Sequence, residues 1–249
     1  MPPKPIQQTV FCMKWGTAYD ARDVNILFAM SRRNAAPGLR FICLTDDDAG
    51  LHPEIEARPL PFLNVPPAFE HQPWRKLVAG AALTDLDGDA LYLDLDLVLR
   101  DDLAAFFSYQ PGRFCIIHDW SHPERNEGNS SVYRFRPRDF AGLAADFEAN
   151  ADEIVHNFPN EQVWLTEQAR RHGEVAFWPD GWCVSFKRHC LGGRLRAALL
   201  TAREPATAKI VVFHGHPKPR EAIKGEWKGR LKRMRPTPWI AKHWCETDQ

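Results

Sequence analysis

Short apolar segments typical of β-strands alternate with helical patterns along most of this chain. The first expected strand covers residues 9–15, and Val24, Leu27 and Phe28 then recur at helical spacing. Further strands are expected at 39–45, 90–99, 113–118, 131–135, 175–178 and 210–214, and further helices at 74–83, 137–150 and 161–172. This alternation predicts an α/β fold with a mostly parallel central sheet and helices on both of its faces.

No internal repeat and no linker divides the sequence, so we expect one domain over residues 1–249. Apolar residues make up 44% and charged residues 26% of the chain, which excludes a disordered protein. Because 32 basic residues balance 32 acidic ones, the net charge does not favour nucleic acid as a partner. The six cysteines are scattered without a C-x-x-C pair, which argues against a disulfide scaffold or a zinc ribbon.

The two ends of the chain bear on location. The N-terminal segment MPPKPIQQTV lacks the apolar core of a secretory signal, and no apolar run approaches the roughly 20 residues that span a bilayer, so we expect a cytoplasmic protein.

At the other end, residues 218–249 form a basic tail within the domain: positions 218–235 hold eight basic and two acidic residues, with Trp227, Leu231 and Met234 among them. Such a tail is either a solvated surface or attracts anionic phosphates, including those at the inner face of a membrane.

The segment LYLDLDLVL at residues 91–99 carries the clearest chemical signal. In a continuous strand, Asp94 and Asp96 share one face while the five leucines occupy the other. Two such carboxylates repel by roughly 2–4 kcal/mol at an effective dielectric constant near 20, which a cation, a shared proton or full solvation must offset. Because Mg²⁺ and Mn²⁺ favour oxygen ligands together with substrate phosphates, we expect a metal site here. The alternative is a strand that ends before Asp96 and leaves both carboxylates solvated.

A late strand leads into a second group of polar residues, His214, Gly215 and Lys218. A neutral histidine can complete a metal shell, glycine permits close backbone approach, and lysine can neutralise a leaving phosphate. Taken alone, such a turn is more often structural. Strand ends of a parallel sheet collect at one crevice, however, so this group and the aspartates can reach one ligand.

In this order, the features resemble nucleotide-sugar-dependent glycosyltransferases of the GT-A fold, and most of all the retaining family of glycogenin and bacterial lipopolysaccharide galactosyltransferases. The stretches that carry the resemblance are CMKWGTAYDARDVNILFAMSRRN, FICLTDD with PWRKL, LYLDLDLVL and VVFHGHPKP. The resemblance implies a single Rossmann-like GT-A domain that transfers a sugar from a nucleoside diphosphate sugar. It further implies a saccharide or lipid-linked acceptor, in surface-polysaccharide or lipopolysaccharide assembly.

The resemblance also implies roles for individual residues. Asp94, Asp96 and His214 would hold Mn²⁺ or Mg²⁺, and Lys218 would steady the leaving diphosphate. Glu161 and Gln162 stand where the family has an Asp-Gln pair near the reacting carbon. Donor contacts are implied for Thr17, Tyr19, Lys76, Asn129, Ser130 and Gly215.

Several of these positions have an equally good structural explanation. The turn at 16–20 can simply enter a helix, and small polar residues at 128–131 suit any loop. Asn160 can cap the helix in which Glu161 and Gln162 lie. Trp178 and Trp182, around a Pro-Asp-Gly turn, either offer aromatic faces to a sugar or pack in the core.

Two other functions fit the same aspartates. In a haloacid-dehalogenase-type phosphatase, Asp94 would attack phosphate and Asp96 would act as acid and base, with Mg²⁺ assisting. That motif usually opens its domain, whereas here about 90 residues precede it, and the expected Gly-Thr after the second aspartate is absent. A protein that binds nucleotide sugars without turnover would use the same residues as a transferase.

Overall fold

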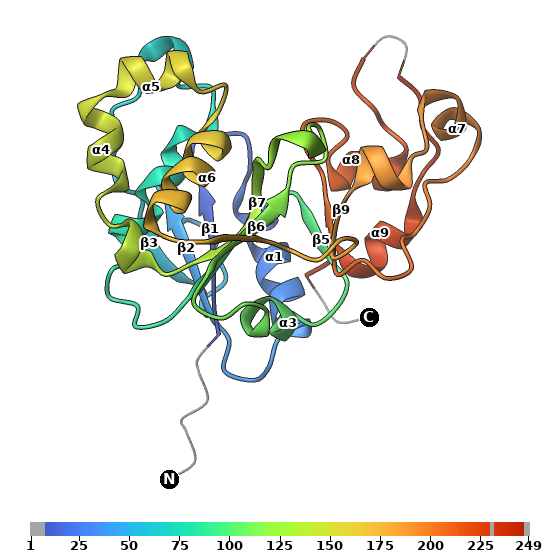
Figure 1. The fold of residues 1–249 in the computed structure, drawn as a ribbon. Coiled ribbons are helices and arrows are strands. Elements are labelled where there is room, and N and C mark those ends of the chain that lie inside the picture. Colours follow the sequence, from blue (N-terminus) through green and yellow to red (C-terminus); the bar gives the residue numbers. More distant parts are fainter. Residues whose placement is uncertain (1–7, 230–231, 247–249) are drawn as a thin grey trace.

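The computed structural model describes residues 8–229 and 232–246; the expectations for the first seven residues and for Leu231 lie outside this range. Two sheets make up the framework: a seven-stranded sheet in the order β3-β2-β1-β4-β7-β6-β8, and a three-stranded sheet in the order β5-β10-β9 (Figure 1). The large sheet consists of β1 (Thr9–Lys14), β2 (Arg40–Thr45), β3 (Glu56–Pro59), β4 (Ala90–Leu93), β6 (Phe114–His118), β7 (Gly128–Phe135) and β8 (Val175–Phe177). The small sheet consists of β5 (Leu97–Leu99), β9 (Cys183–Ser185) and β10 (Ile210–Val212).

All strands of the large sheet run in the same direction except β7, which is antiparallel to both of its neighbours. The expected mostly parallel sheet is therefore confirmed. Both faces are covered, because alternate residues of β1 enter different hydrophobic clusters: Val10 and Cys12 belong to one, Phe11 and Met13 to the other. This is the burial that an all-apolar strand in the centre of an α/β sheet requires.

Helices cover the sheet on both sides (Figure 1). One face carries α1 (Ala21–Arg33), which begins after Asp20 in a capping box with Asp23. The other face carries α4 (Leu143–Ala149), α5 (Ala151–Asn157) and α6 (Glu161–His172). The remaining helices are α2 (Ala79–Ala82), α3 (Ala104–Ser108), α7 (Arg194–Leu199), α8 (Pro219–Lys224) and α9 (Pro238–His243). None of the described helices is long and apolar enough to cross a bilayer.

Three expected elements are wrong in part. The helix at 74–83 is a 3₁₀ helix, Pro73–Val78, followed by the single turn α2, and the helix at 137–150 is the 3₁₀ helix Pro137–Phe140 followed by α4. Both begin with proline, which suits a tight first turn but supplies no N–H donor. The strand at 90–99 is broken into β4 and β5, which belong to different sheets. The five leucines of that segment nevertheless share one hydrophobic cluster, as the alternating pattern predicts.

The small sheet and the C-terminal helices share a core with the first half of the chain. Val98, Val184 and Val211 of the three short strands lie in the same cluster as Val10 of β1. Ile240 of α9 belongs to it as well, so the basic C-terminal segment contains a helix with one buried side and is more than a solvated tail. The two sheets therefore share one core, and the connection between β4 and β5 lies where one sheet passes into the other.

Candidate active site

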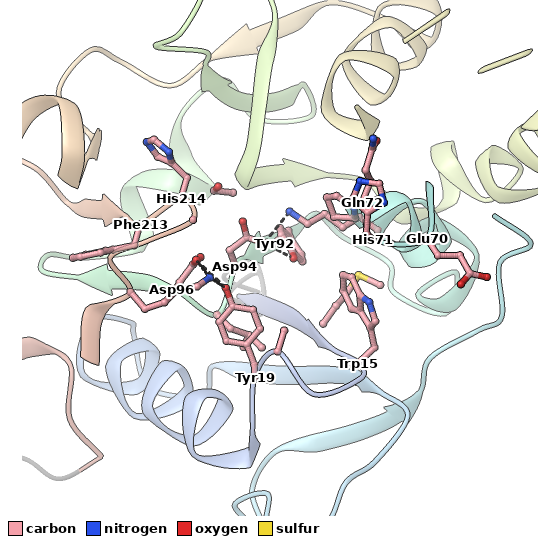
Figure 2. Close-up of a pocket in the computed structure, with 18 residues that line it drawn as sticks. Trp15, Tyr19, Glu70, His71, Gln72, Tyr92, Asp94, Asp96, Phe213 and His214 are labelled. Atoms are coloured by element: carbon pink, nitrogen blue, oxygen red, sulfur yellow. Dashed lines mark hydrogen bonds and ion pairs between the residues drawn. The ribbon is translucent and has the colours of Figure 1, made fainter. Parts of the chain in front are cut away.

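A cavity of about 480 Å³ opens at the carboxyl ends of β1 and β4, the neighbouring strands at which the strand order reverses. Ligands of open α/β sheets bind at this kind of position. Three connections line it together with residues 70–73 and Lys76 (Figure 2). They are the turn after β1 with Trp15 and Tyr19, the β4–β5 connection with Asp94 and Asp96, and the turn after β10 with His214. The backbone N–H of Phe213 donates to the carbonyl of Asp96 (3.1 Å), which joins the last two connections.

Asp96 is buried and held by two side chains from opposite ends of the sequence. Its Oδ2 accepts hydrogen bonds from the Tyr19 hydroxyl (2.8 Å) and from Nζ of Lys218 (2.7 Å). Nζ of Lys218 also contacts the Tyr19 hydroxyl and lies 4.5 Å from the centre of the tyrosine ring. Burial raises the pKa of Asp96, and the nearby Lys218 opposes that rise. The three side chains form one polar unit on the cavity wall.

Asp94 faces the same cavity but has a different lysine. Its Oδ1 accepts from the Tyr92 hydroxyl (2.7 Å) and lies 2.8 Å from Nζ of Lys76. Burial alone would lower the pKa of Lys76, but the carboxylates of Asp94 and Glu161 outweigh it and raise that pKa. The repulsion expected between the two aspartates is therefore offset by one lysine on each.

Behind this wall lies a buried polar layer that contains the residues predicted at the start of α6. The Ser130 hydroxyl donates to Glu161 (2.6 Å) and accepts from Nζ of Lys76 (3.2 Å), and the Ser130 backbone N–H donates to the Gln162 side chain (3.2 Å). Asn160 caps the helix by accepting from the Val163 N–H (3.1 Å). Glu161 is only 2% exposed and reaches the cavity wall through Ser130 and Lys76.

The other predicted contacts divide between the cavity and the surface. Gly215 lines the cavity, whereas Thr17 is exposed and outside its lining. Asn129 also lies outside the lining, where its side chain accepts from the Ser131 N–H (3.2 Å). Trp178 and Trp182 stack with ring centroids 6.4 Å apart and both pack on a core phenylalanine, which favours the packing explanation for this pair.

His214, the third expected metal ligand, lies in the same cavity as Asp94 and Asp96. It lines the cavity, its Nε2 is 2.7 Å from the Ser185 hydroxyl, and its ring stacks on Trp120. Burial, with the nearby Lys187 and Arg188, lowers the pKa of His214 to about 4, so the imidazole is neutral at pH 7. Among the described residues, no three histidine, cysteine or acidic side chains form an assembled metal site. The donor set has suitable chemistry, but its members are engaged with Lys218, Lys76 and Ser185.

Sequence reasoning missed several residues of this neighbourhood, among them Trp15 and residues 70–72 of the cavity lining. Tyr92 lies two positions before Asp94 and could have been found from the strand pattern. Ser185 and Lys187 come from a segment without a motif, and only folding brings them to the late strand. Nζ of Lys187 lies 3.6 Å from the point that a Cβ on Gly215 would occupy, and it makes no hydrogen bond or ion pair within the described part of the chain.

Comparison with known proteins gave matches only among solved structures; no family model and no curated protein matches the chain. A galactosyltransferase, LgtC, in complex with donor and acceptor sugar analogs is 15% identical and superimposes with a TM-score of 0.58, covering 85% of this chain and 89% of that one. The glycosyltransferase GlyE of Streptococcus pneumoniae is 14% identical, with a TM-score of 0.63 and coverage of 95% and 60%. The bifunctional glycosyltransferase WbbM is 12% identical, with a TM-score of 0.55 and coverage of 88% and 48%. The chain thus spans 60% and 48% of the last two proteins, and it has the expected GT-A-like fold.

Proposed function

We propose that this protein is a glycosyltransferase that transfers a sugar from a nucleoside diphosphate sugar to a saccharide or lipid-linked acceptor. The observation that carries the proposal is the pair of aspartates, each matched with a lysine, in a cavity at the reversal of the strand order. In this reaction, the bond between the anomeric carbon and the diphosphate oxygen breaks, and its electron pair stays with the diphosphate. The acceptor hydroxyl forms the new bond and loses its proton.

The lysines are suited to the charge that develops on the leaving diphosphate. A diphosphate that enters the cavity competes with Asp96 for Lys218, whose ammonium is only a quarter exposed and therefore weakly screened. Asp94 and the Ser130 hydroxyl hold the Lys76 ammonium in position. This side chain therefore needs little rearrangement when an anion approaches. Gly215 adds no side chain at this point and permits close backbone approach.

We also propose that the site uses a divalent cation. Asp94, Asp96 and the neutral His214 would hold Mn²⁺ or Mg²⁺, and the bound ion would supply Lewis-acid stabilisation of the departing diphosphate. The proposed setting is the cytoplasm, in surface-polysaccharide or lipopolysaccharide assembly. There the basic C-terminal segment would contact the inner face of the membrane peripherally.

A thermal-shift screen of nucleoside diphosphate sugars, with and without Mn²⁺, tests this proposal. At 100 times its dissociation constant, the right donor should add about 2.7 kcal/mol of stability. Asp96→Asn should abolish the Mn²⁺-dependent part of the shift, whereas Asp87→Asn, whose side chain is 91% exposed, should leave it unchanged.

Turnover separates the proposal from its two alternatives. Donor hydrolysis or transfer, followed as nucleoside diphosphate release, distinguishes an enzyme from a binding protein. Turnover of a chromogenic phosphate ester that is lost in Asp94→Asn would instead support the phosphatase. An Mn²⁺-dependent donor shift that persists in Asp96→Asn would refute the assigned metal ligand.

A further inference from the structure

Outside the cavity, positive charge is concentrated in two segments, 186–203 and 227–238. Each contains five lysines or arginines and no aspartate or glutamate, although the whole chain has equal numbers of basic and acidic residues. The described basic residues of the two segments are Lys187, Arg188, Arg194, Arg196, Arg203, Lys228, Lys232, Arg233 and Arg235. Charge segregation of this kind in a neutral chain creates a local field that favours an anionic partner.

The two segments lie side by side. The backbone N–H of Arg235 donates to the carbonyl of Ala197 in α7 (2.9 Å), so the second segment contacts this helix. Lys187 and Lys232, one from each segment, are close enough that their charges interact. Figure 1 shows α7 beside the C-terminal part of the chain, at the edge of the molecule. We call the exposed side chains of these two segments the α7 surface.

The α7 surface also carries exposed apolar side chains. Leu195, Leu199 and Leu200 are 84%, 70% and 54% exposed, and Phe62 (77%) is the other large apolar side chain in the described chain with comparable exposure. Leu195 and Leu199 are four positions apart and therefore share one side of the helix. Ala197, by contrast, is fully buried against the protein. The helix thus packs on one side and presents leucines outward on the other.

We propose that the α7 surface docks on a membrane of anionic lipids. Exposed leucines on the same segments as exposed basic side chains match the two parts of a lipid interface, its acyl boundary and its phosphates. A second copy of this chain is a poorer fit, because a symmetric contact through this surface would bring two sets of basic residues together. The half-buried Lys187 lies between this surface and Gly215 at the cavity, so docking here would bring the cavity close to a lipid-linked substrate. The docking deepens the peripheral membrane contact of the proposed function and assigns it to a defined surface. Its link to the cavity rests on the proposed sugar transfer, whereas the docking itself does not.

Co-sedimentation of the full chain with vesicles tests the proposal. We expect binding to mixed phosphatidylcholine and phosphatidylglycerol vesicles, and much weaker binding to pure phosphatidylcholine. The double variant Leu195→Ser/Leu199→Ser and the double variant Arg194→Glu/Arg233→Glu should each reduce binding to the anionic vesicles by roughly tenfold or more. Matched controls are Phe62→Ser, with its equally exposed apolar side chain, and Arg171→Glu, whose side chain is 66% exposed; both should bind like the parent.

Several results would overturn the proposal. These are equal binding to both vesicle types, retained binding in the leucine variant, or a dimer of the parent in solution that the leucine variant abolishes. All substituted side chains are exposed, so the thermal midpoint of each variant should match that of the parent. The thermal shift that the donor causes in solution should also be the same in each variant as in the parent. Loss of vesicle binding with an intact donor shift isolates the α7 surface. Conversely, vesicle binding by a chain that shows neither donor shift nor turnover would reject only the proposed sugar transfer.

Discussion

Lys218 is the residue whose contacts most restrict the chemistry of the cavity. It lies more than 120 positions from Asp96 in the sequence, yet its ammonium contacts both that carboxylate and the Tyr19 hydroxyl. This close ammonium opposes the rise that burial causes in the pKa of Asp96, and the same ammonium is available to an incoming diphosphate. Lys218 thus both stabilises the folded protein and contributes to the proposed reaction.

The stabilising part can be measured in a double-mutant cycle. Lys218→Met leaves the buried Asp96 carboxylate without its cation and should destabilise the protein by about 2 kcal/mol, less than the cost of a fully buried pair because Lys218 is a quarter exposed. Asp96→Asn in the same background should recover most of that loss. Urea denaturation gives the four free energies of unfolding. Additive effects of the two substitutions would show that the pair is not coupled.

Among the elements, β3 depends most on charge, because it is a short strand at the edge of the large sheet. Its Glu56 carboxylate accepts a two-pronged contact from Arg40 of β2 (2.8 and 3.0 Å) and also contacts Arg58, which in turn pairs with Asp85. Hydrogen bonds from Arg40 and Arg58 hold the pKa of Glu56 below its usual value, and Arg58 does the same for Asp85. These contacts attach β3 to β2 on its inner side.

This network makes stability depend on acid pH. A carboxyl whose pKa is lower in the folded state stabilises the protein above its unfolded pKa, and this contribution is lost as the pH falls through the folded pKa. For Glu56 the loss should therefore begin near pH 4 and continue below it. Glu56→Gln should be less stable than the parent at pH 7 and lose less stability between pH 5 and pH 3, measured as thermal midpoints. Glu174→Gln, at an exposed ion pair with Arg113, is the control; an unchanged acid dependence in Glu56→Gln would contradict the assignment.

The segment at 91–99 explains how far the sequence could predict this fold and site. Alternating leucines predict burial of one side correctly, because leucines on both parts of the broken strand enter the same core. The break itself is not visible, since a crossover between two sheets preserves the alternation. The lysine partners are also not visible: Lys76 and Lys218 are distant in sequence, and only the fold brings each to its aspartate. Motif residues that are neighbours in the sequence could therefore be predicted, although they lie between two strands and not on one. Ser185 and Lys187, which carry no motif, could not.

At the scale of the whole molecule, the small sheet and the C-terminal helices join the core of the first half. Trp239 of α9 is buried, its indole N–H donates to the carbonyl of Ala202 (3.1 Å), and its ring lies near Phe186. The guanidinium of Arg100, which follows β5, lies 5.9 Å from the centre of the same ring. The Trp239 side chain thus connects α9 with the residues that follow β5 and β9, the two edge strands of the small sheet.

These contacts predict that the described chain unfolds as one unit. Trp239→Ala should cost about 3–5 kcal/mol, the usual loss for a buried aromatic residue, and should lower the stability of the whole chain. Far-UV circular dichroism, which reports all helices, and tryptophan fluorescence should then give one coincident urea transition for both the parent and the variant. Trp227→Ala, at a half-buried tryptophan of the adjacent segment, is the control and should cost less. Two separated transitions, with only one shifted by Trp239→Ala, would show that the C-terminal part folds as its own domain. In that case the hydrophobic core that the first half shares with the small sheet would not be what keeps the two sheets, and the cavity at the connection between β4 and β5, in place.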